Sequence, residues 1–505
     1  RNSQSRNTIQ TDWIEVTKLP IMVGSSLCTS TCGGKLYDPL FSREDAGGYF
    51  ILKGNKKAIF YKPRLKFNEI LVVPHGKTAS SVSNEEALSI NDLEVNIISK
   101  RAYSYPSYQH FLIIMCEQSV LSLKISTLSP AKSPNSNQPT NKLYNIFSVI
   151  KGISGMRDID IVQYLLKDVY LSNVPEEAYS LITVTLQESL KNPIDDATIE
   201  IIKYSIAHLG EEDDKGEFLL YCIRKLLRVA LRYEPVDVRD SYNRTKLMDT
   251  PGSLIEELFI SYMKIIKKSI HDKILRQTVI QEVSLLSELR IFQSEYMLKF
   301  FISNDYWGTS KKKHVCELIQ PMNYLSQLES LRKITEEEKE KNKIIEKRRS
   351  HTDYQGFICS ITSPTSQNIG LHKFWALFGF SNAYIYKYHH NWLHILRKYM
   401  SSVKDDKKRY YDVFLDGIIL GQLSVEGVHN IVKYIETEKF NDLEKYGECT
   451  VVYVDYTRLN VNVNTHGGRI LVPVVRLKDN RVPVHYGDIH GMTKFKTEMK
   501  VGILV

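Results

Sequence analysis

The sequence predicts a multidomain α+β protein, because its hydrophobic pattern changes character twice along 505 residues. Residues 13–130 carry short β-branched and aliphatic runs separated by turn residues, which is typical of strands. From Tyr144 the apolar residues recur at helical spacing, and from Asp412 strand-like alternation returns. At about 150 residues per domain, this length corresponds to roughly three or four domains.

The first β-rich region contains one clear hairpin signal. Gly54-Asn55 lies between the two apolar halves of the run 47–61, where a tight turn is expected. Further apolar runs extend to residue 125. Residues 131–142 are rich in Pro, Ser and Asn and predict a loop or domain linker.

The region that follows predicts a helical domain of about one hundred residues. Asp158 and Asp160 resemble a metal-ligand pair, but they precede an apolar helical run, so helix capping is the favoured role. Pro175 and the two glutamates after it mark another helix start. A polar hinge, 235–252, ends the region. Its charge cluster of Asp237, Arg239 and Asp240 is interpreted as an ion-pair network.

The second half begins with a long helical pattern from Leu254 to Ile302. One stripe of this helix is apolar: Leu254, Leu258, Phe259, Tyr262, Ile265 and Ile266. The charge run 334–349 predicts an exposed helix or a mobile loop. Residues 372–380 and 391–403 are expected to be helical. In the β-rich tail, turns are expected at Asp416-Gly417 and at 466–468.

Composition limits the class of protein. The formal net charge of +9 is mild for this length, so no polycationic tail is implied. Seven scattered cysteines argue against a disulfide framework, and the spacing of Cys28 and Cys32 has no second pair to complete a zinc site. No apolar run is long enough to span a bilayer, and the polar start is unlike a signal peptide. The chain begins with Arg and is interpreted as a piece of a longer protein.

No complete enzyme active site is predicted in this chain. The phosphate-binding G-x-x-x-x-G-K-[ST] loop, the H-E-x-x-H zinc motif and the G-x-S-x-G nucleophile motif are all absent from the sequence. His389 and His390 are adjacent, so on a helix they point to different faces and make a poor ligand pair. A nucleic-acid interface is better supported. Basic residues cluster at 311–313, 332–333 and 347–349, and Trp307 and Tyr324 are available for stacking.

Eight segments, in their order along the chain, carry a resemblance to a known family. They are LPIMVGSSLC at 19–28, GGYFILKGNKK at 47–57, VRDSYNRTKL at 238–247, YWG at 306–308, LSQLESLRK at 325–333, HTDYQGFICSITSPTSQNIGLHK at 351–373, VFLDGIILG at 413–421 and THGGRILVPV at 465–474. Together they resemble the N-terminal half of the second-largest (β-type) subunit of multisubunit DNA-directed RNA polymerases.

The sequence also departs from the family pattern. Where the family has E-T-P-E-G, this chain has Thr362, Ser363, Pro364, Thr365 and Ser366, so both acids and the glycine are replaced. Glu317 stands where the family has Gln, and Lys56 stands where Glu is usual. Such drift indicates a divergent branch, for instance that of a large cytoplasmic DNA virus or a linear cytoplasmic plasmid. The expected location is the cytoplasm, with the virion as an alternative.

The resemblance implies a division into named regions. These are a β-rich protrusion at 1–143 that returns at 248–305, an inserted helical lobe at 144–247, a fork at 306–378 and a β-rich external region at 379–505. The family reaction is template-directed nucleotidyl transfer with two magnesium ions, which are held mainly by the largest subunit. The expected partners are therefore the largest subunit, smaller polymerase subunits, template DNA and transcript RNA, with no membrane. No zinc site and no catalytic residue are expected in this part, and alone it is expected to be inactive.

The same resemblance places seven residues toward nucleic acid. They are Glu317 in an RNA-facing loop, Arg332 and Lys333 against backbone phosphate or bracing the fork, Gln367 and Asn368 near the RNA–DNA hybrid, and, with no more specific role, Gln320 and Arg348. An acid at Glu317 would repel phosphate, so direct contact by this residue is doubtful. Three alternatives stay open. These residues only brace loops, the chain is a non-catalytic nucleic-acid-binding protein derived from a polymerase subunit, or it is a standalone helical interaction module that resembles the family by chance.

Overall fold

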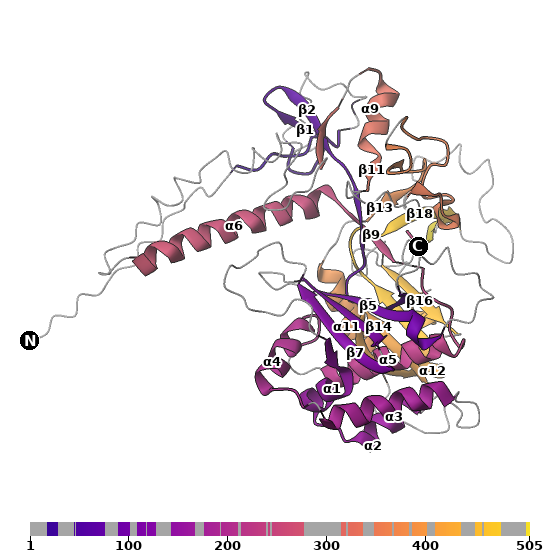
Figure 1. Ribbon diagram of the computed structural model, residues 1–505. Coiled ribbons are helices and arrows are strands. Elements are labelled where there is room, and N and C mark those ends of the chain that lie inside the picture. Colours follow the sequence, from indigo (N-terminus) through magenta and orange to yellow (C-terminus); the bar gives the residue numbers. More distant parts are fainter. Residues whose placement is uncertain are drawn as a thin grey trace, which may run out of the picture. The chain divides into compact units, whose positions relative to one another are not determined.

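The computed structural model divides the chain into two compact units (Figure 1). Unit 1 comprises Arg1–Lys62 and Asp249–Lys339, and unit 2 comprises Pro63–Met248 and Glu340–Val505. The structure describes residues 18–28, 45, 47–75, 89–100, 109–117, 119–127, 143–166, 176–191, 193–210, 214–238, 241–242, 245–276, 315–319, 322–336, 348–365, 368–382, 386–400, 410–435, 450–456, 459–475 and 501–504.

Unit 2 contains a five-stranded antiparallel sheet whose strands follow one another in sequence order. They are β4 (Leu71–Pro74), β5 (Leu93–Lys100), β6 (Gln109–Glu117), β7 (Val120–Thr127) and β8 (Leu143–Asn145), with a short 3-10 turn, Ile90–Asp92, before β5. Ile97 faces Leu112, and Ile114 faces Leu123, so one face of the sheet carries buried aliphatic side chains. The predicted strand content of this region is confirmed.

The helices that pack on this sheet are α1 (Ile146–Ser154), α3 (Glu176–Lys191), α4 (Asp196–Ser205) and α5 (Lys215–Ala230), and α2 (Asp158–Leu166) packs against α5 (Figure 1). The Asn145 carboxamide caps α1 by accepting from two backbone N–H groups, and Asp214 caps α5 in the same way. Asp160 lies in the first turn of α2 and accepts from the backbone N–H of Arg157, so the predicted role at a helix start is confirmed.

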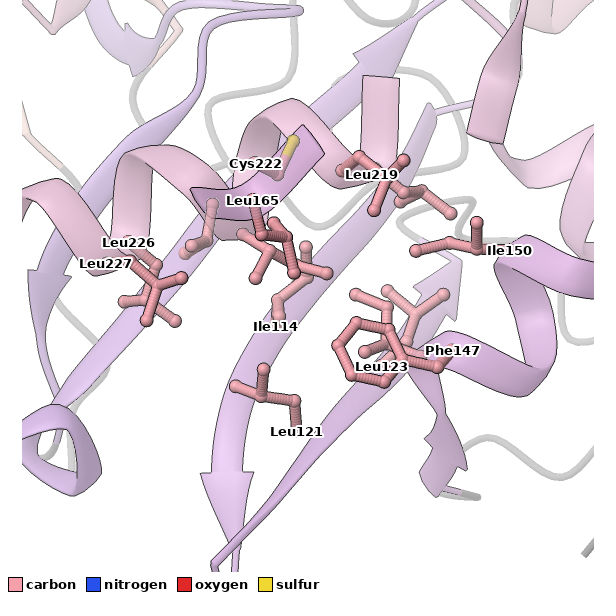
Figure 2. Packing of buried hydrophobic residues seen from close by; sticks show 14 of the residues in the cluster. Ile114, Leu121, Leu123, Phe147, Ile150, Leu165, Leu219, Cys222, Leu226 and Leu227 are labelled. Atoms are coloured by element: carbon pink, nitrogen blue, oxygen red, sulfur yellow. The ribbon is translucent and has the colours of Figure 1, made fainter. Parts of the chain in front are cut away.

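Helices and sheet share one hydrophobic core, which includes the side chains shown in Figure 2. Phe147, Leu123 and Leu219 are each 0% exposed. Burying a side chain of this size contributes about 1.5–3 kcal/mol, so this core is the main source of stability for the region. The helices that contribute to this core confirm the helical spacing of apolar residues predicted from Tyr144 onward.

A second sheet in unit 2 has the strand order β15-β14-β17-β16. Its strands are β14 (Tyr410–Leu415), β15 (Ile418–Ser424), β16 (Val451–Asp455) and β17 (Asn460–Asn464), and it packs against α11 (Tyr386–Tyr399) and α12 (Val425–Tyr434). Trp392 of α11 is 0% exposed at the centre of this core. Leu415 faces Ile418, and both Asp416 and Gly417 have positive φ, so the predicted turn is confirmed.

Unit 1 is built on the three-stranded sheet β1-β2-β10. Strands β1 (Phe50–Leu52), β2 (Asn55–Ile59) and β10 (Cys316–Leu318) pair antiparallel, and they accompany helices α6 (Pro251–Arg276) and α9 (Tyr324–Leu331) and strand β11 (Lys333–Thr335). Leu254, Leu258, Tyr262 and Ile266 of α6 are buried against Phe50 and Cys316. The apolar stripe predicted for this helix is therefore confirmed as far as Arg276, and residues 277–302 lie outside the described residues.

Three local predictions need correction. The first hairpin forms, but its turn is Lys53-Gly54, because Asn55 already pairs with Leu52 and the two turn residues have φ of 49° and 81°. The charge run 334–349 is predicted to be exposed, yet Ile334 lies in β11 and is 0% exposed. Residues 466–468 do not close a hairpin, because β17 and β18 (Ile470–Val475) belong to different sheets.

The helix predicted for 372–380 is wrong. This segment forms β12 (His372–Phe374) and β13 (Phe380–Ser381), with a tight turn in which the Gly379 N–H donates to the Ala376 carbonyl. The backbone N–H of Ala376 donates to the Phe357 carbonyl at 2.9 Å, so pairing with a distant segment outweighs the helical spacing.

Strand β13 pairs with β18, which also pairs with β19 (Val501–Leu504), while β3 (Lys62–Leu65) pairs with β9 (Lys246–Asp249).

A helix of the structure was not predicted, and a predicted linker cannot be compared with the structure. Helix α12 was not predicted, because the whole tail from Asp412 was interpreted as strand-rich. The linker predicted at 131–142 lies outside the described residues. Among the described residues, no helix is both long enough and apolar enough to cross a membrane.

We expect Phe147→Ala to lower the free energy of unfolding by about 3–5 kcal/mol, because it removes a fully buried ring from the shared core. Leu190→Ala is the matched control, since Leu190 is 71% exposed and its loss should change stability by about 0.5 kcal/mol or less. Urea denaturation followed by circular dichroism measures both. Equal losses in the two variants would contradict the packing of Phe147 in the core.

Candidate nucleic-acid interface

In unit 1, the predicted site residue Glu317 lies on β10, opposite Ala58 of β2. Ala58 and Phe60 are buried together with Tyr49 and Ile319, and Leu331 of α9 packs against this group. Tyr61 extends the same strand and exchanges backbone hydrogen bonds with Lys333 and Thr335 of β11. The run 58–61 therefore holds the elements that carry Glu317 and Lys333.

Glu317 and Lys333 form an ion pair. The Lys333 ammonium lies 3.2 Å from the Glu317 carboxylate and 4.7 Å from the centre of the Phe60 ring. The Lys333 side chain is 18% exposed and the Glu317 side chain 24%, so both groups are largely removed from solvent. Sequence reasoning selected both residues but treated them as separate, because sixteen positions separate them.

Arg332 and Tyr324 lie at opposite ends of α9. The Asn323 carboxamide caps the start of this helix by accepting from the Ser326 N–H, and the Arg332 backbone closes its end. Tyr324 is 55% exposed, which is compatible with its predicted use in stacking. Gln320, Trp307 and the cluster 311–313 lie outside the described residues.

Lys56, which replaces the Glu usual in the family, has a local acidic partner. Its ammonium lies 3.5 Å from the Asp45 carboxylate and 4.5 Å from the centre of the Tyr49 ring. The Tyr49 hydroxyl also donates to Asp45 at 2.6 Å. Burial alone would raise the pKa of Asp45, but the Tyr49 hydroxyl, the Gly47 N–H and Lys56 together lower it. The departure at Lys56 is therefore balanced within unit 1.

In unit 2, Arg348 and Asn368 are brought next to each other. The Arg348 guanidinium donates to the carbonyl of Ile369 at 2.9 Å, and the Asn368 carbonyl accepts from the Leu371 N–H. Gly370 has φ of +78°, and a Cβ there would lie 2.5 Å from the Arg348 carbonyl oxygen. This glycine therefore allows the close approach of the two chain segments. Gln367 lies outside the described residues.

The segment that replaces the family's E-T-P-E-G folds back onto a thiol. The Cys359 thiol donates to the Thr362 hydroxyl at 3.4 Å, and the Thr362 N–H lies 3.5 Å from the same sulfur. Thr362 thus makes a local contact with no charged group. Ile361 beside it is 90% exposed.

Two of the resemblance segments, 238–247 and 351–373, meet at Tyr242. This ring is 0% exposed and packs edge-to-face on Tyr354 at 4.9 Å. The Lys246 ammonium lies 4.4 Å from the centre of the Tyr242 ring, and the Lys373 ammonium donates to the Tyr242 hydroxyl at 3.3 Å. The Ser241 hydroxyl also donates to Asp353. Sequence reasoning missed the two buried lysines because it searched for consecutive basic residues.

A second polar junction in unit 2 surrounds Asp416, whose side chain is 6% exposed. Its carboxylate accepts from the Thr465 backbone N–H at 2.6 Å and from the Thr465 hydroxyl. It also lies 2.7 Å from His389 Nδ1 and 3.6 Å from His466 Nε2. His389 therefore points into this junction, while its neighbour His390 is exposed.

The surroundings of this junction lower the pKa values of Asp416 and His466. Burial would raise the pKa of Asp416, but His466, His389 and Thr465 together hold it well below its usual value. Burial lowers the pKa of His466, and the cationic Arg469 and Lys66 lower it further, while Asp416 and Glu69 oppose them. The favoured state is a charged Asp416 beside a neutral His466.

The predicted ion-pair role of the hinge cluster is confirmed for Asp237. Its carboxylate accepts from the Val72 N–H and the Lys225 ammonium, each at 3.0 Å. Arg239 and Asp240 lie outside the described residues. In the part of the chain that the structure describes, no group of three or more His, Cys, Asp or Glu side chains could hold a metal ion.

Comparison with known families accounts for the order of these elements. The family model "RNA polymerase beta subunit" matches residues 1–299, and "RNA polymerase Rpb2, domain 3" matches residues 317–379. The first match covers more than half of the chain. The chain therefore belongs to the β-type subunits of multisubunit RNA polymerases.

Individual relatives agree with this class and narrow it to the second subunit. The chain is 24% identical to "DNA-directed RNA polymerase subunit Rpo2" of Sulfolobus acidocaldarius, over 96% of this chain and 44% of the relative. It is 24% identical to "DNA-directed RNA polymerase III subunit RPC2" of Saccharomyces cerevisiae, over 99% and 44%. It is 23% identical to "DNA-directed RNA polymerase subunit 2" of Acanthamoeba polyphaga mimivirus, over 93% and 41%. The chain thus spans less than half the length of these relatives.

We expect Gly370→Ala to destabilise the segment 348–373 by more than about 2 kcal/mol, because the new methyl group meets the Arg348 backbone at a positive φ. Gly356→Ala is the matched control. Gly356 has φ of +81°, but no atom lies within 4 Å of the place that the new methyl group would take, so only the cost of about 1–2 kcal/mol for a left-handed residue applies. Hydrogen exchange of the segment separates the two variants, and equal exchange rates would refute the close approach.

Acid should weaken unit 2 through His466. Its pKa is lower in the folded chain than its ordinary value of 6.5, so the folded state binds fewer protons there than the unfolded state. This contribution is fully present above pH 6.5 and is lost as the pH falls below that value. We expect the free energy of unfolding to fall between about pH 7 and 5, and to fall less in His466→Gln. His429→Gln, at an exposed position on α12, should keep the wild-type pH dependence.

Proposed function

We propose that this chain is the N-terminal part of the second-largest subunit of a DNA-directed RNA polymerase. The enzyme is a nucleotidyltransferase that copies a DNA template into RNA from nucleoside triphosphates. The observation that carries this proposal is the two family matches, which follow one another along residues 1–299 and 317–379. Relatives named as second subunits in archaea, eukaryotes and a virus support it over at least 93% of the chain.

In this proposal the chain forms one side of the DNA cleft and borders the RNA–DNA hybrid. Arg332 and Lys333 supply positive charge from unit 1, and Arg348 and Asn368 supply hydrogen-bonding groups from unit 2. Gln320 and Gln367, each outside the described residues, are proposed as further hydrogen-bonding groups for nucleic acid. Magnesium ions held by the largest subunit would clamp the attacking and leaving oxygens. The residues of this chain bind and position nucleic acid.

The proposed partners are the largest polymerase subunit, smaller subunits, the DNA template and the transcript. Co-purification of the full-length subunit with a largest subunit, followed by a transcription assay, tests the assignment. Assembly with template-dependent RNA synthesis is the expected result. Nucleic-acid binding without a polymerase partner would favour the alternative of a non-catalytic protein derived from such a subunit.

We infer a cytoplasmic enzyme of a divergent viral or plasmid branch. The loss of both acids at Thr362 and Thr365 supports the divergence. The described cysteines are all free thiols, as in a reducing compartment. Fractionation of the source cells and virions tests the location, and recovery in nuclei would refute it.

Replacing Arg332 and Lys333 by alanine in the assembled enzyme should slow transcript elongation and make its dependence on salt shallower, because cationic groups near the hybrid are lost. Lys268→Ala, on the exposed face of α6, is the control for a lost surface charge. Elongation rates over a KCl series measure the effect. Unchanged elongation and salt sensitivity in the double variant would exclude a role of this pair in nucleic-acid contact.

A further inference from the structure

Lys333, a cation that unit 1 is proposed to offer to nucleic acid, already forms an ion pair with Glu317 of the same chain. Lys333 has three N–H donors, and one of them points to Glu317 at 3.2 Å. The centre of the Phe60 ring lies 4.7 Å from the same ammonium. A phosphate that reaches this ammonium must therefore approach next to a carboxylate.

The surroundings of the pair keep its members together. Glu317 is fixed by the β10–β2 pairing, and Lys333 is fixed by its backbone hydrogen bond with Tyr61. Both side chains are less than a quarter exposed, so solvent screens their attraction less than it screens a surface pair. Among neighbouring charges, Lys57 lies on the opposite face of the sheet, since it is adjacent in β2 to Ala58, which faces Glu317.

We propose that Glu317 is a positioning residue that masks Lys333, so that nucleic-acid phosphate has to displace an internal carboxylate to gain this contact. This inference rests on the proposed function. It makes Glu317 a determinant of how tightly the enzyme holds the RNA–DNA hybrid. The expected effect of substitution is opposite to the usual one. Removing the Glu317 carboxylate, although it belongs to the interface, should strengthen binding of the hybrid.

The masking role differs in its consequences from a purely structural brace. A masked lysine contributes little to counterion release, because its charge is already balanced inside the protein. Removing the acid should add about one phosphate contact and steepen the dependence of log affinity on log salt by about 0.9. A brace that only holds β10 and β11 together would lose stability on mutation and leave the salt dependence unchanged.

The test compares Glu317→Gln with wild type in the assembled polymerase carrying the full-length subunit. Glutamine keeps the size of the side chain and one acceptor oxygen, removes the charge and replaces the second oxygen with an NH2 donor. Dissociation of a synthetic RNA–DNA hybrid scaffold is measured over a KCl series. The expected result is tighter binding by between about twofold and fivefold, with a steeper salt slope.

Two controls make the result specific. Glu256→Gln removes the same charge from an exposed position on α6 and should leave both affinity and slope unchanged. In a Lys333→Gln background, Glu317→Gln should give no increase in salt slope, because the masked cation is absent.

The outcomes separate this inference from the proposed function. If the wild-type assembly makes no RNA, the proposed function fails. If it transcribes and Glu317→Gln behaves like Glu256→Gln, only the masking role fails. A melting temperature lowered in Glu317→Gln with an unchanged salt slope in the folded enzyme would also overturn it.

Discussion

The arrangement of the C-terminal half of unit 2 depends on one buried carboxylate. Asp416 occupies a turn with positive φ, where its charge can be kept only because hydrogen-bond donors surround it. These donors come from α11, through His389, and from the segment after β17, through Thr465. The Asp416 carboxylate thus fixes the positions of both α11 and the segment after β17. Losing either partner would leave a buried charge only partly compensated, which costs far more than a surface ion pair.

The same arrangement recurs at Tyr242, and the two junctions explain what the resemblance segments have in common. Segments 238–247 and 351–373 meet through Tyr242 and Lys373, and segments 413–421 and 465–474 meet through Asp416 and Thr465. Four of the eight segments therefore hold distant parts of the chain in register. A family pattern that survives in a divergent sequence here marks buried polar packing at least as much as contact with nucleic acid.

Much of the fold could be predicted because it follows from local periodicity. The stripe of α6 and the caps of α1 and α5 need only residues close in sequence. The segment around Trp375 could not be predicted, because its helical spacing of apolar residues is overridden by backbone pairing with Phe357 and Cys359. The site shows the same limit. Arg332 and Lys333 were found as a basic cluster, but the partner of Lys333 lies on another strand, and the isolated Lys373 gave no cluster at all.

Pairing also changes what a basic cluster means in this chain. Lys56, Lys225 and Lys333 each lie within 3.5 Å of a carboxylate, so their formal charges overstate the potential that an approaching phosphate would meet. In unit 1 both pairs involve a departure from the family pattern: Lys56 gains Asp45, and Glu317 covers Lys333. The two changes have opposite sign, since Lys in place of Glu adds two positive charges and Glu in place of Gln adds one negative charge, and together they raise the formal charge of unit 1 by one. The departures at Lys56 and Glu317 have therefore redistributed charge around the β1-β2-β10 sheet. How strongly Lys56 or Lys333 can bind a phosphate depends on whether each stays paired with its carboxylate.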